Sequence, residues 1–185
     1  MNVLSIGNSF SQDAQKFLHE IAASGGVQLH AENLYIGGCP LRVHAENLRS
    51  GEAAYDDEIN GERVGTISLP EALRLRAWDV VTLQQSSGTS GEYDSYQPYL
   101  NELAAAVRAA CPGVRLFIHQ TWAYEDGADH PDCARYSCDR KQMFAQLTAA
   151  YRQAAADIEA EFIPVGTVIE RLRDRAPGFI VRQGG

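Results

Sequence analysis

Short apolar runs alternate with longer stretches of helical periodicity over most of this chain of 185 residues. The apolar runs occupy residues 2–6, 27–36, 80–83, 114–119 and 162–166, and the helical patterns occupy residues 11–23, 69–76, 96–110, 142–161 and 168–175. In the first helical pattern, Phe17, Leu18 and Ile21 recur at helical spacing. Strands that alternate with helices predict βαβ units, and therefore a mostly parallel sheet.

One segment departs from this alternation. Residues 53–68 contain Asn60-Gly61 between strand-like flanks, a pattern typical of a β-hairpin. No repeat, low-complexity tract or interdomain linker is evident. We therefore expect residues 1–185 to form a single α/β domain. Its predicted architecture is a three-layer α/β/α sandwich, flavodoxin-like, with a parallel sheet of about five strands and a small β-hairpin excursion.

The chain is acidic, with a net charge of −8 and an isoelectric point near 5.1. Such a surface repels phosphate backbones, so we expect no nucleic-acid partner. No apolar run approaches the roughly 18 residues that a membrane span requires, and no signal-peptide pattern opens the chain. The sequence thus favours a soluble, cytoplasmic protein without a membrane partner, and it leaves the oligomeric state open.

The four cysteines, Cys39, Cys111, Cys133 and Cys138, form no C-x-x-C pair. Scattered cysteines in a chain of this length are more typical of reduced thiols than of a disulfide framework. His130 lies close in sequence to Cys133 and Cys138, but a zinc site needs a fourth ligand and tighter pairing. We expect neither a metal nor a cofactor.

Small and polar residues follow the apolar runs at the point where each run ends. Parallel sheets bind ligands at the carboxyl ends of their strands. The groups at these positions are Gly7-Asn8-Ser9, Gly37-Gly38-Cys39, Gln84-Gln85-Ser86 and His119-Gln120-Thr121-Trp122. We expect these groups to line one crevice.

Ser9 has two interpretations, one structural and one chemical. With Gln12 it matches the S-x-x-Q capping box, in which the hydroxyl satisfies an unpaired N–H of the following helix. A serine at a helix amino terminus also lies beside free N–H groups, which stabilise the oxyanion formed when a serine attacks a carbonyl. Ser11 could cap the helix instead and leave Ser9 free to react.

The other strand-end residues also have both a structural and a chemical interpretation. Gly38 either forms a tight turn that needs positive φ, or brings a backbone N–H close to a ligand. The amides of Gln84 and Gln85 either bond neighbouring loops or donate to a developing negative charge. His119 is typical of a satisfied core residue, although a strand-end imidazole could also face Ser9 as a base.

Three further groups are interpreted from their sequence surroundings. Trp122 and Tyr124 either pack a loop or line a pocket. His44, within PLRVHAENL, is expected on the solvated face of a helix. The carboxylates of the segment YDDE, residues 55–58, are expected to be solvated charges on the hairpin.

Five segments in order resemble the blocks of the SGNH, or GDSL-like, hydrolase superfamily: IGNSFSQDA, LYIGGCPL, WDVVTLQQ, HQTWAY and IPVGTVI. The likeness covers nearly the whole chain and is closest to an uncharacterised bacterial SGNH-like family. It implies that Ser9 is the nucleophile and that the N–H groups of Ser9 and Gly38 and the amide of Gln85 form an oxyanion hole. It further implies a pocket lining of Asn8, Gln84, His119 and Trp122.

The chain departs from this resemblance in three places. Asn8 stands where an aspartate is common, and glutamines stand where the third block has an asparagine. The last block, an Asp and a His three residues apart that supply the general base, has no match in the carboxyl-terminal region. The segment Asp126-Gly127-Ala128-Asp129-His130 lies in a middle loop and has a different spacing. The domain is therefore expected to lack its C-terminal catalytic block, and the base would come from beyond Gly185.

By resemblance, the chain is interpreted as a serine ester hydrolase of the SGNH type. Its expected substrate is a small acyl ester, for example an O-acetyl ester of a carbohydrate. The alternative is a non-catalytic SGNH-like ligand-binding module, which the missing base and the glutamine substitution favour. A flavodoxin-like nucleotide binder is disfavoured, because no G-x-G-x-x-G or Walker loop follows a strand.

Overall fold

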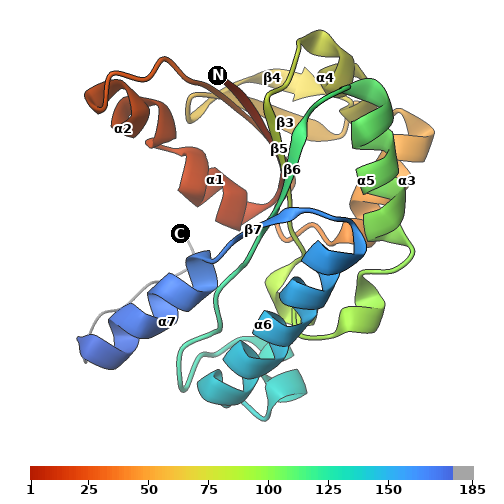
Figure 1. Ribbon diagram of the computed structural model, residues 1–185. Coiled ribbons are helices and arrows are strands. Elements are labelled where there is room, and N and C mark those ends of the chain that lie inside the picture. Colours follow the sequence, from red (N-terminus) through yellow and green to blue (C-terminus); the bar gives the residue numbers. More distant parts are fainter. Residues whose placement is uncertain (177–185) are drawn as a thin grey trace.

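The computed structural model describes residues 1–176, in which a seven-stranded sheet carries helices on both faces (Figure 1). The strands are β1 (Asn2–Gly7), β2 (His30–Tyr35), β3 (Tyr55–Ile59), β4 (Glu62–Ile67), β5 (Val80–Leu83), β6 (Arg115–His119) and β7 (Glu161–Ile163). The α-helices are α1 (Ser9–Gln15), α2 (Leu18–Ser24), α3 (Leu41–Ser50), α4 (Leu69–Leu75), α5 (Tyr99–Ala110), α6 (Arg140–Asp157) and α7 (Val165–Arg175). Short 3₁₀ helices are η1 (Ser87–Thr89), η2 (Tyr93–Ser95) and η3 (Pro131–Tyr136).

The strand order is β4-β3-β2-β1-β5-β6-β7. The five adjacent strands β2, β1, β5, β6 and β7 pair in parallel, as the alternation of strands and helices predicts. The hairpin β3–β4 pairs antiparallel with β2, so it extends the sheet at one edge. The predicted α/β sandwich with its hairpin is therefore confirmed, and the hairpin is part of the same sheet.

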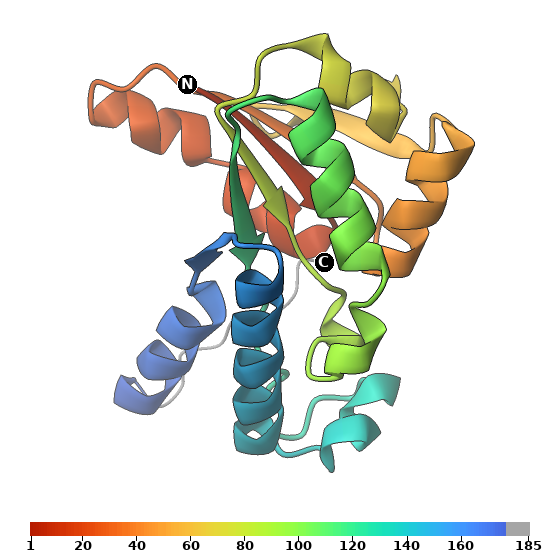
Figure 2. The same cartoon turned by 45° about the vertical axis from the view of Figure 1, so that its right-hand side comes forward.

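The two faces of the sheet are covered by different helices (Figure 2). Helices α3, α4 and α5 pack together on one face, above fully buried residues such as Leu4, Val81 and Ile118. Helices α1 and α2 lie on the other face, where a groove of about 360 Å³ remains open. No helix within residues 1–176 has the length and apolarity to cross a bilayer.

Two helical regions differ from the sequence prediction. Residues 11–23 were predicted as one helix, but the structure divides them into α1 and α2, because Phe17 leaves the helical conformation with a ψ of 8°. Helix α3 was expected only through His44, which the sequence placed on a solvated helix face, and the burial of this helix differs from that prediction. It buries Leu41, His44 and Ala45 against the core, and Gly51 in the left-handed region ends it.

His44 is fully buried, so the prediction of a solvated histidine is wrong. Its Nδ1 lies 2.9 Å from the hydroxyl of Tyr55, and the two rings stack. Burial lowers the pKa of His44 to about 3, because the charged imidazolium loses its hydration. The histidine is therefore neutral near pH 7.

The carboxylates of Asp57 and Glu58 are also buried rather than solvated. Strand β3 pairs with β2 inside the sheet, and α1 covers this region. As a result, Glu58 accepts hydrogen bonds from Asn33 and from Gln12 of α1. Burial and the neighbouring carboxylate of Glu32 raise the pKa of Asp57.

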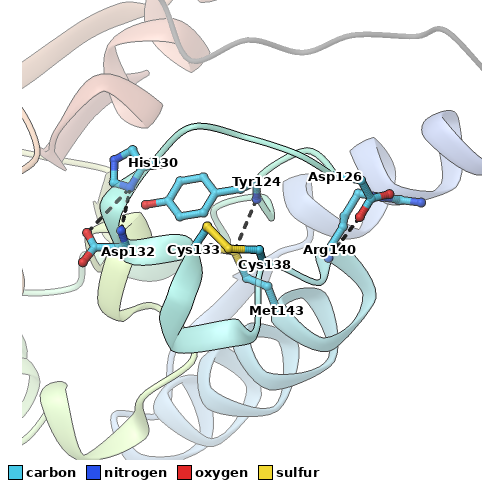
Figure 3. Close-up of a disulfide and its surroundings, with 8 residues drawn as sticks. All are labelled: Tyr124, Asp126, His130, Asp132, Cys133, Cys138, Arg140 and Met143. Atoms are coloured by element: carbon cyan, nitrogen blue, oxygen red, sulfur yellow. Dashed lines mark hydrogen bonds and ion pairs between the residues drawn. A yellow bond between two sulfur atoms is a disulfide. The ribbon is translucent and has the colours of Figure 1, made fainter.

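Cys133 and Cys138 form a disulfide in the loop between β6 and α6 (Figure 3). The prediction of four reduced thiols is therefore wrong for this pair, while Cys39 and Cys111 are free and buried. The turn after η3 brings the two Cα atoms within 4.5 Å, a proximity that sequence spacing alone does not reveal. Among residues 1–176, no group of three or more His, Cys, Asp or Glu side chains could hold a metal ion.

Candidate active site

Asn8, rather than Ser9, organises the turn between β1 and α1. Asn8 is buried and is the N-cap residue of α1, with its Oδ1 accepting from the N–H of Phe10 at 3.2 Å. The same oxygen accepts from Nε2 of Gln84, and Nδ2 donates to the carbonyl of Cys39 at 3.1 Å. One side chain thus connects the segments that follow β1, β2 and β5.

Ser9 is the first residue of α1 and is partly exposed. Its hydroxyl forms no hydrogen bond with any residue of the described range 1–176. The hydroxyl of Ser11 donates to the carbonyl of Asn8 at 2.8 Å. The capping interpretation of Ser9 is therefore wrong, and Ser11 is not the cap either, because Asn8 takes that role.

Gly38 lies in the turn that follows β2. Its φ is +62°, and a Cβ on it would meet no atom within 4 Å. The backbone conformation, rather than crowding, therefore favours glycine here. The N–H of Gly38 makes no hydrogen bond within residues 1–176, and the contact between Asn8 and Cys39 attaches this turn to the residue before Ser9.

The amide of Gln85 is fully buried and occupied at both ends. Its Oε1 accepts from the N–H groups of Leu41 at 3.0 Å and Ser86 at 2.9 Å. Its Nε2 contacts the carbonyl and the hydroxyl of Ser95, both at 3.1 Å. Gln85 therefore connects the start of α3, just after the Gly38 turn, to the loop that follows β5. Its role as an oxyanion donor stays a prediction, because the amide would first have to leave Ser95.

Gln84 lies directly over Gly7. A Cβ on Gly7 would approach Cδ of Gln84 to 2.8 Å, so the glycine allows this close packing. The Oε1 of Gln84 is buried without a hydrogen-bond partner in the described range. A buried polar atom of this kind is costly unless it serves a ligand or a bound water.

Trp122 connects the segment after β6 to α1, which follows β1. Its ring packs edge-on against Phe10 of α1, with centroids 4.3 Å apart, and its buried Nε1 has no partner within residues 1–176. Together with the two contacts of Asn8, this packing joins all four strand-end groups at one edge of the sheet. The predicted convergence of these groups is therefore observed.

His119 is buried on the face of the sheet that α1 and α2 cover, where it lines the open groove with Ser5, Gln15 and Thr82. Its Nε2 has no partner in the described residues, so the prediction of a satisfied core histidine is wrong on that point. Burial lowers the pKa of His119 to about 4. Within residues 1–176, its ring forms no hydrogen bond with Ser9.

Two features of this edge were missed from the sequence. The hydroxyls of Ser87 and Tyr124 lie 2.9 Å apart, and the Tyr124 ring stacks on His130 with centroids 4.4 Å apart (Figure 3). The role of Asn8 as cap was also missed, although asparagine is a favoured N-cap residue and the signal was present.

The fold is shared with solved structures of other proteins. A protein of Slackia heliotrinireducens named as a candidate SGNH hydrolase superposes with a TM-score of 0.65 at 24% identity, over 92% of this chain and 82% of that chain. A variant of Axe2, an acetyl-xylooligosaccharide esterase from Geobacillus, superposes with a TM-score of 0.57 at 12% identity, over 95% of this chain and 80% of that chain. At these identities the likeness concerns the fold, which is that of the SGNH hydrolases.

The family is shown by a closer match. Residues 2–179 match the family described as a domain of unknown function, DUF4886, and the chain belongs to this family. The crystal structure of a DUF4886 family protein from Bacteroides uniformis is 35% identical, with a TM-score of 0.89 over 94% of this chain and 70% of that chain. A comparison with curated proteins found no match.

Proposed function

We propose that the protein is a serine ester hydrolase of the SGNH type, with Ser9 as its nucleophile. The observation that carries this proposal is that Ser9 is partly exposed and that its hydroxyl has no hydrogen-bond partner within residues 1–176. Asn8 performs the capping that would otherwise occupy this hydroxyl. A serine with no structural hydrogen bond, at a strand-to-helix turn where four strand ends meet, is suited to nucleophilic attack.

In the proposed reaction, Oγ of Ser9 attacks the ester carbonyl carbon and its proton passes to a general base. The carbonyl oxygen becomes an oxyanion and accepts hydrogen bonds from the N–H groups of Ser9 and Gly38. The base then protonates the departing alcohol, and water releases the acid from the acyl-enzyme. Asn8 and Gln85 act as positioning residues, because they bind Cys39 and Leu41, which lie one and three residues after Gly38.

We propose that the general base comes from a segment beyond residue 185, as the SGNH resemblance implies. The chain contains five histidines. His19 lies in α2, where its Nε2 is 4.0 Å from Oε1 of Glu20. His44 and His119 are buried, with pKa values lowered to about 3 and about 4. His30 begins β2 and therefore lies at the amino end of a parallel strand, opposite the candidate site. The Nδ1 of His130 accepts from its own loop, at the N–H of Asp132.

The proposed substrate is a small acyl ester, for example an O-acetyl group on a carbohydrate, by analogy with the esterase Axe2. The cytoplasmic location stays a prediction. The Cys133–Cys138 disulfide supports an oxidising compartment instead, because cytosolic thiols are kept reduced.

A fluorophosphonate probe tests the proposal on the natural full-length protein. We expect wild type to be labelled on the peptide that contains Ser9, and Ser9→Ala to remain unlabelled. The matched control is Ser11→Ala, which removes a neighbouring hydroxyl and keeps the nucleophile. Equal labelling of wild type and Ser9→Ala, or no labelling of wild type, would reject Ser9 as an activated nucleophile.

A hydrolysis assay tests the source of the base. The chain ending at Gly185 should hydrolyse p-nitrophenyl acetate slowly, because a triad without its base loses most of its rate. Rapid hydrolysis by this short form that is lost in His119→Ala would identify His119 as the base and overturn the proposal of an outside segment.

A non-catalytic ligand-binding module is the second candidate. It is favoured by the Gln85 amide, which contacts Ser95 instead of being available as a third donor. Binding of an ester to the full-length protein without turnover, unchanged in Ser9→Ala, would support this alternative.

A further inference from the structure

The loop between β6 and α6 carries both η3 and the Cys133–Cys138 disulfide (Figure 3). Cys138 is exposed and Cys133 is half-buried, so a small thiol in solution can reach the bond. The buried thiols of Cys39 and Cys111 are not in this position. Chemistry at the disulfide therefore does not require access to the buried thiols of Cys39 and Cys111.

The turn that the disulfide closes has an unfavourable backbone conformation. Ser137 and Cys138 have φ values of 56° and 50°, which puts two consecutive non-glycine residues in the left-handed region. Such conformations are costly and persist only where surrounding contacts impose them. The backbone bond from the N–H of Cys138 to the carbonyl of Cys133, at 2.8 Å, closes the same turn. Opening the disulfide would let these residues relax.

Helix η3 packs directly on the loop that follows β5, residues 86–95. The Tyr136 hydroxyl donates to the carbonyl of Gly88 at 2.9 Å and accepts from the N–H of Gly91 at 3.0 Å. The Asp132 carboxylate packs closely on Gly88. A Cβ atom added to Gly88 would lie only 2.2 Å from Oδ2 of Asp132. The position of the 86–95 loop therefore depends on the order of η3.

The 86–95 loop is in turn bonded to the candidate active site. Ser95 accepts from the amide of Gln85, and Oε1 of Gln85 accepts from the N–H of Leu41, three residues after Gly38. At the other end of the loop, the hydroxyl of Ser87 bonds that of Tyr124. A continuous series of contacts thus runs from the disulfide to the Gly38 turn.

We propose that the Cys133–Cys138 disulfide is a redox-sensitive latch on the 86–95 loop. When the disulfide is formed, η3 is ordered and fixes the loop through Tyr136. When a dithiol reduces it, η3 relaxes and the loop is released. One thiolate of the dithiol attacks a disulfide sulfur and forms a mixed disulfide, and its second thiolate displaces the protein sulfur. The dithiol is oxidised to its disulfide. The two electrons and two protons that it loses convert Cys133 and Cys138 into two free thiols.

The movement of the loop does not depend on the proposed function, whereas any effect on ester hydrolysis rests on it. The first readout is therefore hydrogen exchange at the Gly91 amide, which donates to Tyr136. We expect exchange to accelerate about tenfold or more when wild type is treated with dithiothreitol, because the bond then opens locally. Tyr136→Phe should show fast exchange with the disulfide intact.

The double variant Cys133→Ser/Cys138→Ser should exchange fast with and without dithiothreitol. Cys111→Ser is the matched control and should respond to dithiothreitol as wild type does. Unchanged exchange at Gly91 on reduction would overturn the latch, and so would alkylation of Cys133 and Cys138 in unreduced protein. Absence of ester hydrolysis in both redox states would count against the proposed function alone. The latch is tested separately by the hydrogen exchange of the Gly91 amide.

Discussion

Replacing Asn8 with alanine should destabilise the fold strongly, whereas replacing Ser9 should not. Asn8 makes three side-chain hydrogen bonds, to the N–H of Phe10, to the amide of Gln84 and to the carbonyl of Cys39. The Ser9 hydroxyl makes none within residues 1–176. Asn8→Ala and Ser9→Ala therefore form a matched pair, which tests which of the two adjacent residues caps α1.

The magnitude follows from these bonds. Loss of the N-cap costs about 1 kcal/mol. Each of the other two neutral bonds contributes about 1 kcal/mol. The Gln84 amide would then lose its partner as well, since its Oε1 is already unpaired, and this adds about 1 kcal/mol. The expected loss for Asn8→Ala is about 4 kcal/mol, against about 0.5 kcal/mol or less for Ser9→Ala.

Urea unfolding monitored by circular dichroism measures both values. In thermal unfolding, the loss for Asn8→Ala corresponds to a lower Tm by about 10 °C for a chain of this size. Asn8→Asp should fall between the two, because it keeps the acceptor for Phe10 and places an oxygen beside the Cys39 carbonyl. A loss below about 1 kcal/mol for Asn8→Ala, or an equal loss for Ser9→Ala, would refute the assignment of the cap.

Two further predictions concern burial. The pKa values of His44 and His119, about 3 and about 4 in the folded protein, lie below the ordinary 6.5, so the unfolded chain binds protons first as the pH falls. Stability should therefore be fully present above about pH 6.5 and decline toward pH 4, by about 2 kcal/mol per histidine at pH 5. Equal urea stability at about pH 7.5 and pH 5 would contradict this, and His44→Gln should remove about half of the difference. Gly166→Ala should cost about 3 kcal/mol in thermal unfolding, because its Cβ would lie 2.1 Å from the Thr121 carbonyl oxygen. Gly65→Ala, with no atom within 4 Å, is the control, and similar losses for both would disprove the close packing.

The alternation of apolar runs and helical patterns was enough to predict the parallel sheet, helices α4 to α7 and the hairpin. Each of these features depends on residues a few positions apart, such as the helical pattern of residues 96–110, which the structure shows as α5 (Tyr99–Ala110). The strand-end rule also predicted that Asn8, Gly38, Gln84 and Trp122 would meet at one edge. The contacts from Asn8 to Cys39 and Gln84, and from Phe10 to Trp122, confirm that convergence.

Tertiary structure decided which of these groups are available for chemistry. Asn8 is the cap and Gln85 is bound to Ser95, while His44 is buried and Cys133 is paired with Cys138. Local spacing could not reveal this, because the bonds of Asn8 join residues 31 and 76 positions apart. Local sequence sets backbone conformation through neighbours along the chain, but burial and hydrogen-bond partners depend on which distant segments the folded sheet brings together.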